Sequence, residues 1–358
     1  MIVNADARFI PLADESVNCV ITSPPYYGLR DYGTARWEGG DPNCEHTVGS
    51  GDNDNLKLYV TRPERDGAKR QYCQKCGAIR IDEQIGLEQT PDEYIANLVA
   101  VFRECKRILR DDGTLWVNIG DSYAGSGGAG GDYSKGGLKE GQPKWKSNLD
   151  AQAAGLKSKD LIGIPWMLAF ALRSDGWYLR QDIIWAKPNP MPESVKDRCT
   201  KAHEYVFLLT KSARYYYDAE AVKEPVSEVS LKRAEYGWDC DRPSTKNGSM
   251  GGEGIHTERM GTRFVDPAGR NKRSVWTVPT RPYKGAHYAT FPPDLIKPMI
   301  LAGCPAGGIV LDPFVGSGTT VMVATELGRR GIGLDLNMKY LDVNARERLA
   351  SVQPLIFA

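Results

Sequence analysis

Apolar residues along the chain gather in short runs that end at polar or glycine-rich turns, a pattern typical of buried β-strands. Longer segments with apolar residues every three or four positions predict helices. At 358 residues, the chain can bury a proper core as one decorated α/β domain or as a domain with an insert. The expected strands are 2–3, 17–21, 114–119, 181–185, 205–210, 308–311 and 331–334, and the expected helices begin near 90, 161, 292 and 321.

The best-defined of these helices begins at Thr90-Pro91-Asp92-Glu93. Thr90 is expected to cap it, Pro91 suits the first helical position, and Glu93 can complete a capping box. Apolar positions from Ile95 to Leu109 then form one buried stripe, and Asp112-Gly113 is expected to stop the helix. This helix is predicted as scaffold.

A proline-rich motif, Ser23-Pro24-Pro25-Tyr26, directly follows the strand 17–21. Each proline fixes φ and lacks an amide donor, so the Ser23 hydroxyl and nearby carbonyls can converge as an acceptor trap for an amino group. The Tyr26 ring offers a flat surface on which a planar heterocycle can stack. A stiffened structural turn is the alternative interpretation.

A second motif, Asp312-Pro313-Phe314-Val315-Gly316-Ser317-Gly318-Thr319-Thr320, lies between the strand 308–311 and a helix-forming run from Val321 to Leu327. Its glycines let backbone approach a ligand and leave helix amides free for a carboxylate. Asp335 ends the next strand, where a ribose-binding acid is expected. No lysine follows Gly318, so the loop is not a phosphate-binding P-loop. The glycines alone would suit a nicotinamide cofactor, but the full G-x-G-x-x-G is missing.

The two motifs, in this order, resemble those of the amino-methylating DNA methyltransferases that use S-adenosylmethionine, in the permuted order of their β group. The resemblance covers nearly the whole chain. It implies an α/β, Rossmann-like methyltransferase fold, circularly permuted, with a mostly parallel seven-stranded sheet and 205–210 at its antiparallel edge. It also implies that Ser23, Pro24, Pro25 and Tyr26 are catalytic. The implied cofactor-binding residues are Asp6, Phe291, Asp312, Pro313, Phe314, Gly316, Ser317, Gly318, Thr319, Thr320 and Asp335.

Charge and composition limit the kinds of partner that the chain is expected to bind. Lys and Arg total 46 and Asp and Glu total 45, giving a net charge of +1, so affinity for nucleic acid must come from local patches. The longest apolar run, 161–172, is too short to span a bilayer, and 1–6 lacks the features of a signal peptide. We therefore expect a cytoplasmic protein with no membrane partner. Its 8 cysteines are expected as thiols or metal ligands.

The polar, glycine-rich insertion 28–89 contains Cys44-Glu45-His46 and Cys73-Gln74-Lys75-Cys76-Gly77. A Cys-x-x-Cys knuckle with another soft pair upstream is how a structural zinc closes a loop that cannot build its own core. We expect tetrahedral zinc on Cys44, His46, Cys73 and Cys76. Free surface cysteines are the alternative, because the Cys-x-His spacing is tighter than usual.

Two further segments are candidates for DNA contacts. Residues 124–159, rich in Gly, Lys and Ser, are predicted as a flexible flap that closes on phosphates, with a solvated loop as the alternative. Residues 212–285 alternate basic and aromatic side chains, and by the resemblance they form the target-recognition region; a solvated charge run is the alternative. Basic residues of its later part, with Asp266 as the local acid, are Arg259, Arg263, Arg270, Lys272, Arg273, Arg281 and Lys284.

The remaining segments are assigned to the catalytic domain. Segment 1–27 carries the catalytic motif, 90–123 and 160–211 form the middle of the domain, and 286–358 binds the cofactor. Asp121 is a candidate site residue at a strand end, although a helix-capping or turn role is expected more strongly. Lys187 and Trp185 are expected to line the base pocket.

The hypothesis that follows is a site-specific DNA methyltransferase that acts on a base flipped out of double-stranded DNA. Ser23 and the Pro24 carbonyl would hold the amine, Tyr26 would stack on the ring, and no catalytic cysteine is needed. Serine in this motif resembles the cytosine-N4 members, so cytosine N4 is the expected target and adenine N6 the alternative.

Other interpretations stay open at this point. They are a non-catalytic, zinc-containing DNA-binding protein and a methyltransferase that acts on RNA or on a protein amide. A cognate restriction endonuclease is a candidate partner, and either a monomer or a homodimer would fit.

Overall fold

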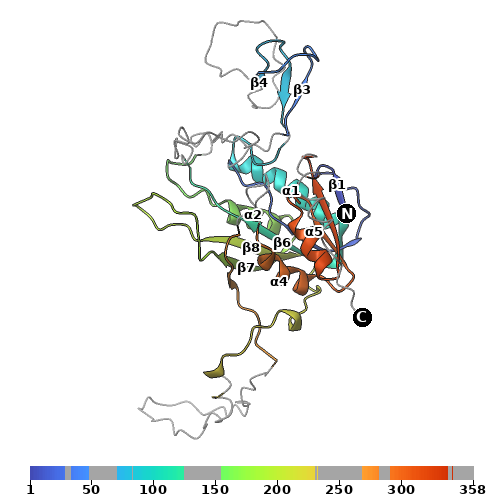
Figure 1. The fold of residues 1–358 in the computed structure, drawn as a ribbon, viewed down its shortest axis with the longest axis vertical. Coiled ribbons are helices and arrows are strands. Elements are labelled where there is room, and N and C mark those ends of the chain that lie inside the picture. Colours follow the sequence, from blue (N-terminus) through green and yellow to red (C-terminus); the bar gives the residue numbers. More distant parts are fainter. Residues whose placement is uncertain are drawn as a thin grey trace, which may run out of the picture.

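The chain forms an α/β body with a small β lobe that stands off one end of it (Figure 1). Among the described helices, none combines the length and the apolar character needed to cross a bilayer. The computed structural model describes residues 1–28, 34–47, 71–82, 84–124, 155–229, 232, 268–281, 291–337 and 341.

The body is built on one mostly parallel sheet. Strand β8 is the exception, because it runs antiparallel to both of its neighbours, β6 and β7. This confirms the predicted α/β class and the mostly parallel sheet. In spatial order the strands are β1 (Ile2–Asn4), β11 (Arg330–Asp335), β10 (Ile309–Asp312), β2 (Val17–Thr22), β6 (Leu109–Ile119), β8 (His203–Thr210), β7 (Tyr178–Ala186) and β9 (Val275–Thr277).

The edge of the sheet differs from the expectation. The described sheet has 8 strands rather than seven, and β8 lies inside it rather than at its edge. The added strand is β9, which pairs in parallel with β7 and comes from the segment assigned to target recognition. Its three residues are too short for a periodic signal, but Trp276 anchors it with only 6% of its surface exposed.

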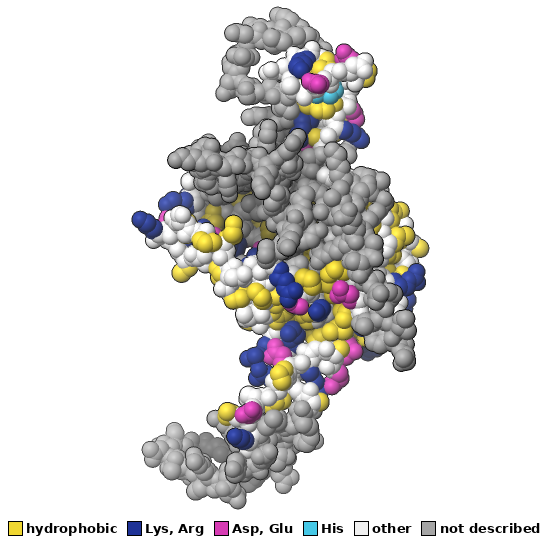
Figure 2. Space-filling model, in the orientation of Figure 1, with side chains coloured by type: hydrophobic (Ala, Val, Ile, Leu, Met, Phe, Trp, Pro, Cys, Tyr) yellow, Lys and Arg dark blue, Asp and Glu magenta, His cyan; other side chains and the backbone are white. Residues whose placement is uncertain are grey.

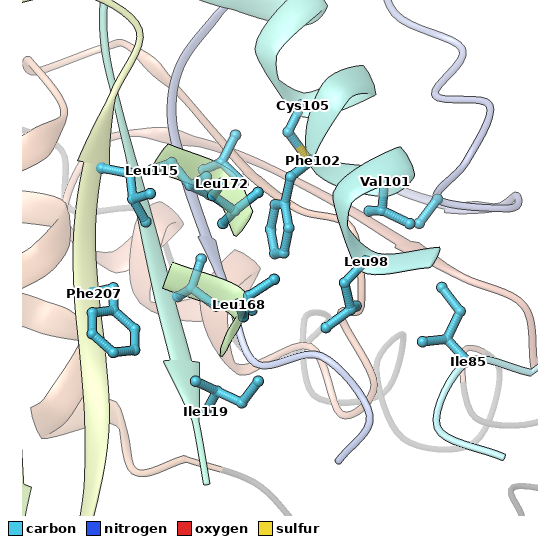
Figure 3. Packing of buried hydrophobic residues seen from close by; sticks show 14 of the residues in the cluster. Ile85, Leu98, Val101, Phe102, Cys105, Leu115, Ile119, Leu168, Leu172 and Phe207 are labelled. Atoms are coloured by element: carbon cyan, nitrogen blue, oxygen red, sulfur yellow. The ribbon is translucent and has the colours of Figure 1, made fainter. Parts of the chain in front are cut away.

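Helices cover both faces of the sheet and create two hydrophobic cores. Alternation along each strand divides the side chains: on β2, Val20 enters one core while Cys19 and Ile21 enter the other. Figure 3 shows the first core, where α1 and α2 pack on the sheet. The helices are α1 (Pro91–Ile108), α2 (Ile164–Ser174), α4 (Pro293–Gly303) and α5 (Thr319–Glu326), with a short 3₁₀ turn, η2 (Glu220–Val222).

Helix α1 begins as predicted and ends earlier. The Thr90 hydroxyl accepts from the Glu93 amide at 3.2 Å, and the Glu93 carboxylate accepts from the Thr90 amide at 3.2 Å, which completes the capping box. The helix stops at Ile108 instead of continuing to Asp112-Gly113. Leu109, fully buried, is drawn into the sheet, where it pairs with Val17.

The lobe is a separate antiparallel sheet. Its strands are β3 (Arg36–Glu38), β5 (Ile79–Ile81) and β4 (Gln71–Tyr72), in that spatial order. It belongs to the predicted insertion 28–89, and the residues between 48 and 70 lie outside the described part. Most of the segment 124–159 and a large part of 212–285 lie outside it as well.

Candidate active site

The two sequence motifs meet at one edge of the sheet. Strands β2, β6, β10 and β11 are parallel, so their carboxyl ends share that edge. The Ser23 loop leaves β2 and the glycine loop leaves the neighbouring strand β10. Both loops line a single cavity of about 990 Å³. The cavity thus joins the first residues of the chain to segments some three hundred positions away.

The glycine loop is organised around the buried carboxylate of Asp312, which is 1% exposed. One carboxylate oxygen accepts from the Thr22 hydroxyl at 2.7 Å and from the Phe314 amide at 3.1 Å, and the other accepts from the Thr320 hydroxyl at 2.6 Å. Burial raises the pKa of Asp312 to about 6, despite these bonds. Asp312 therefore fastens the loop to β2 and to the start of α5.

Strand β11 supports the loop from the other side. The Asp335 carboxylate accepts from the Gly316 amide at 3.0 Å and from the Asn337 amide at 2.8 Å, and burial raises its pKa. Gly333 makes the close contact possible, because a Cβ there would lie 2.4 Å from a methyl group of Val315. The loop can therefore lie flat against β11.

The cavity collects most, but not all, of the predicted cofactor residues. Gly318 and Thr320 are absent from its lining: Gly318 begins α5 and Thr320 bonds to Asp312. Asp6 lines the cavity and pairs with Arg8 at 2.6 Å; burial alone would raise the pKa of Asp6, but the bonds and charge of Arg8 lower it. The other predicted residues that line the cavity are Phe291, Asp312, Pro313, Phe314, Gly316, Ser317, Thr319 and Asp335.

The Ser-Pro-Pro-Tyr loop is held by side chains from elsewhere. The Tyr94 hydroxyl of α1 donates to the Pro25 carbonyl at 2.8 Å, which leaves Ser23 and Pro24 at the cavity wall. Gly120, at the end of β6, lets the Tyr26 ring pack close, since a Cβ there would lie 2.7 Å from the ring. All four predicted catalytic residues line the cavity.

A carboxylate that we did not single out from the sequence, Glu204, fixes the Tyr26 side chain. Its Oε2 accepts from the Tyr26 hydroxyl at 2.6 Å and from Asn118 Nδ2 at 3.2 Å, while its other oxygen pairs with Lys187. Burial, followed by the charge of Glu204, raises the pKa of Tyr26. The available signal was an acidic residue directly before the apolar run 205–210.

Lys187 and Trp185 line the cavity as expected, and Asp121 takes the expected structural role. The Asp121 carboxylate accepts from the amides of Gly163 and Ile164 at 3.0 and 3.1 Å, so it caps the start of α2. Lys201, also unanticipated, donates to the Asp121 carbonyl at 2.8 Å, and burial lowers its pKa.

The basic stretch of the predicted recognition region is not an unpaired charge run where the structure describes it. Glu224 pairs with Arg273 at 2.8 Å and with Arg270 at 3.5 Å. Arg281 pairs with Asp294 of α4 at 2.5 Å. Glu224 and Asp294 lie before and after the basic stretch in the sequence, so its local composition did not reveal them as partners. Arg259, Arg263 and Lys284 lie outside the described residues, as do the flap residues between 125 and 154.

The four predicted metal ligands come together in the lobe. One donor atom from each of Cys44, His46, Cys73 and Cys76 lies within 4.8 Å of the others. This cluster is separate from the cavity, since none of its members lines it.

Comparison with known proteins places the chain in a family. Residues 17–346 match the N6/N4 family described as DNA methylase, so the chain belongs to that family. It is an S-adenosylmethionine-dependent DNA methyltransferase whose target is an exocyclic amine, cytosine N4 or adenine N6.

Two relatives cover nearly the whole chain. Type II methyltransferase M.Cfr9I of Citrobacter freundii is 42% identical over 338 residues, which span 93% of this chain and 81% of the relative. Type II methyltransferase M.SmaI of Serratia marcescens is 40% identical over 338 residues, which span 94% of this chain and 86% of the relative. The non-catalytic alternative is therefore excluded.

Solved structures support the Rossmann-like methyltransferase fold. The cytosine-N4-specific PvuII DNA methyltransferase superimposes with a TM-score of 0.54 at 15% identity, covering 100% of this chain and 87% of the other. The Thermus thermophilus protein TTHA0409, solved with S-adenosyl-L-methionine, gives a TM-score of 0.50 at 18% identity, covering 98% of this chain and 92% of the other. At these identities the likeness concerns the fold alone.

Proposed function

We propose that the chain is a site-specific methyltransferase that modifies the N4 amine of a cytosine flipped out of double-stranded DNA. The observation that carries this proposal is the single cavity lined both by Ser23 to Tyr26 and by the glycine loop. A base at the first wall and a methyl donor at the second would share one space. Serine at position 23 favours cytosine through the family resemblance, and adenine N6 is the second candidate.

The Ser23 loop supplies what an exocyclic amine lacks. Such an amine donates its lone pair into the aromatic ring and is a poor nucleophile. Acceptors that hold its two hydrogens favour the tetrahedral nitrogen needed for attack. The Ser23 hydroxyl and the Pro24 carbonyl are the proposed acceptors, and the Tyr26 ring, held by Glu204, is the stacking surface.

The residues on the glycine side fit a methyl donor. Residues of the loop, Phe314 and Gly316 among them, line the cavity, while the Asp312 carboxylate bonds to Thr22 and Thr320. Asp6, Phe291, Asp335 and the loop residues are the proposed contacts, Asp335 toward a ribose. When bound, S-adenosylmethionine supplies an electrophilic methyl group. The chain's own part is to align the amine and to exclude water from the cavity.

Target flipping and the biological setting are further parts of the proposal. The acceptors at Ser23 lie in a cavity rather than on an open surface, so a base paired within a duplex could not reach them. The relatives named above are type II methyltransferases, which supports a role beside a restriction endonuclease of the same specificity.

The deciding experiment identifies the modified nucleoside. Mixed-sequence DNA is incubated with the protein and labelled S-adenosylmethionine, digested, and analysed by mass spectrometry. We expect N4-methylcytosine. N6-methyladenine would overturn the cytosine assignment, and label in RNA or protein but not in DNA would overturn the proposal as a whole.

A further inference from the structure

The lobe carries a second site, remote from the cavity, that the methyltransferase reaction does not use. We propose that Cys44, His46, Cys73 and Cys76 bind one structural zinc ion, and that this ion holds the lobe together. The donor set, three thiolates and one imidazole, is typical of structural zinc sites. The inference does not depend on which base the enzyme modifies.

Two of the distances between donor atoms match the edges of a tetrahedral zinc site. With Zn–S bonds of about 2.3 Å and Zn–N bonds of about 2.0 Å, two sulfurs should lie about 3.8 Å apart and a sulfur and a nitrogen about 3.5 Å apart. Cys44 Sγ and Cys73 Sγ are 3.8 Å apart, and Cys76 Sγ and His46 Nδ1 are 3.3 Å apart. A disulfide would need about 2.05 Å between sulfurs.

The groups around the cluster hold its ligands in place. The Cys73 amide donates to the Ala78 carbonyl at 2.8 Å, and the Gly77 amide donates to the Cys73 carbonyl at 2.9 Å, which fixes the turn that carries Cys73 and Cys76. The Trp37 ring stacks on the His46 imidazole, with 4.8 Å between centroids. No side chain fits at Gly40, where a Cβ would lie 2.7 Å from Cys76 Sγ.

The lobe has little else to hold it together. Among its described residues, only Cys73 and Ala78 are buried apolar side chains, at 2% and 1% exposure. Three short strands without a larger core are marginal in water, and a metal is a common substitute for that core. On the face in view, Figure 2 shows both basic and acidic side chains on the described part of the lobe, so that part of the surface is not a one-signed phosphate-binding patch.

The lobe is tied to the cavity at both ends of its chain segment. Thr34 and Gln84, which flank it, line the cavity, and the Thr34 hydroxyl donates to the Asp82 carboxylate at 3.1 Å. A metal that closes the lobe therefore also holds these two rim positions together.

Metal content of the full-length protein tests the proposal. We expect about one zinc per chain by elemental analysis, and thiolate-to-metal charge-transfer and d–d absorption bands typical of a tetrahedral site after replacement by Co²⁺. Cys76→Ser should lower the zinc content at least several-fold. Cys199→Ser, which removes an exposed cysteine outside the cluster, is the matched control and should keep it.

A second measurement covers the case in which Cys76→Ser folds poorly. In the unaltered protein, chelation should accelerate proteolytic cleavage between residues 36 and 82 on the order of tenfold, and added zinc should reverse this. Binding of S-adenosylmethionine serves as the check that the body is intact. A protein that neither contains zinc nor takes up zinc or Co²⁺, or a Cys76→Ser variant with a full equivalent, would overturn the proposal.

Discussion

The two loops that face each other across the cavity are held in place by different means. The glycine loop is fixed by an acid within it: the Asp312 carboxylate accepts from the buried hydroxyls of Thr22 and Thr320 and from the Phe314 amide. The Ser23 loop is fixed by two prolines and by partners from distant segments, Tyr94 and Glu204. Changes in the first loop should therefore alter stability and cofactor binding together, whereas changes in the second should alter turnover with the fold intact.

Ser23→Ala tests the second half of this comparison and has the largest expected effect. Loss of one acceptor for the amine should lower turnover about 10²–10³-fold, by analogy with the removal of one oxyanion-hole donor. Binding of S-adenosylmethionine, measured by calorimetry, should stay within about twofold. Ser16→Ala, which removes an exposed hydroxyl in the same segment, should leave both unchanged. Wild-type turnover in Ser23→Ala would show that Ser23 does not hold the target amine.

Asp312→Asn tests the first half through pH. The pKa of Asp312 is raised from 3.8 in the unfolded chain to about 6 in the folded protein, so the folded protein binds this proton more tightly than the unfolded chain does. Its contribution to stability is complete below about pH 4 and is lost as the pH rises through about 6. The isosteric amide does not titrate. The wild type should lose up to about 3 kcal/mol relative to Asp312→Asn over this range.

Denaturant unfolding of both proteins at several pH values gives this difference. Parallel stability profiles between pH 4 and pH 7 would contradict the raised pKa. Cofactor affinity, measured alongside, should change with stability if the glycine loop behaves as one unit.

Glu204→Gln has a smaller expected effect and sharpens the comparison. The variant removes the charge that pairs with Lys187 and weakens the hold on Tyr26, so kcat/KM should fall about tenfold, equivalent to about 1.4 kcal/mol. Tyr26→Phe should lower kcat/KM by a similar factor. In the double variant, the fold-loss of kcat/KM should be much smaller than the product of the two single fold-losses.

Glu193→Gln is the matched control, because Glu193 lines the same cavity but pairs with Arg198 instead. Fully multiplicative losses for Glu204→Gln and Tyr26→Phe would show that Glu204 does not act through the tyrosine. If Glu193→Gln lowered kcat/KM equally, the loss in Glu204→Gln would reflect the removal of a negative charge from the cavity and not the contact with Tyr26.

Features encoded in neighbouring residues could be predicted from the sequence. The capping box at Thr90 is such a feature, and the glycine loop and the Ser23 loop are others, because prolines and glycines restrict their own backbone directly. The fact that both loops reach one cavity followed from the parallel order of their strands. The metal cluster was visible as two spaced pairs, although only the fold could bring those pairs within 4.8 Å.

Features that depend on distant partners could not be predicted. Glu224 pairs with Arg270 and Arg273, and Arg281 pairs with Asp294, whereas the sequence showed these basic residues with Asp266 as the nearby acid. Helix α1 ends early because Leu109 pairs with Val17, which comes from a distant part of the chain. Glu204 gains its position only because β8 lies beside β6, which brings it next to Asn118 and Tyr26.

Gly333 lies on β11, outside the glycine-loop motif, yet the absence of its side chain sets where that loop can lie. The Cβ of an alanine there would lie 2.4 Å from a methyl carbon of Val315, too close for a non-bonded contact, so the glycine loop or β11 would have to shift. A homologous chain could therefore keep every letter of the D-P-F-x-G-S-G signature and still lose its donor pocket. Surveys that judge such enzymes competent from the signature alone should also read the strand beside it.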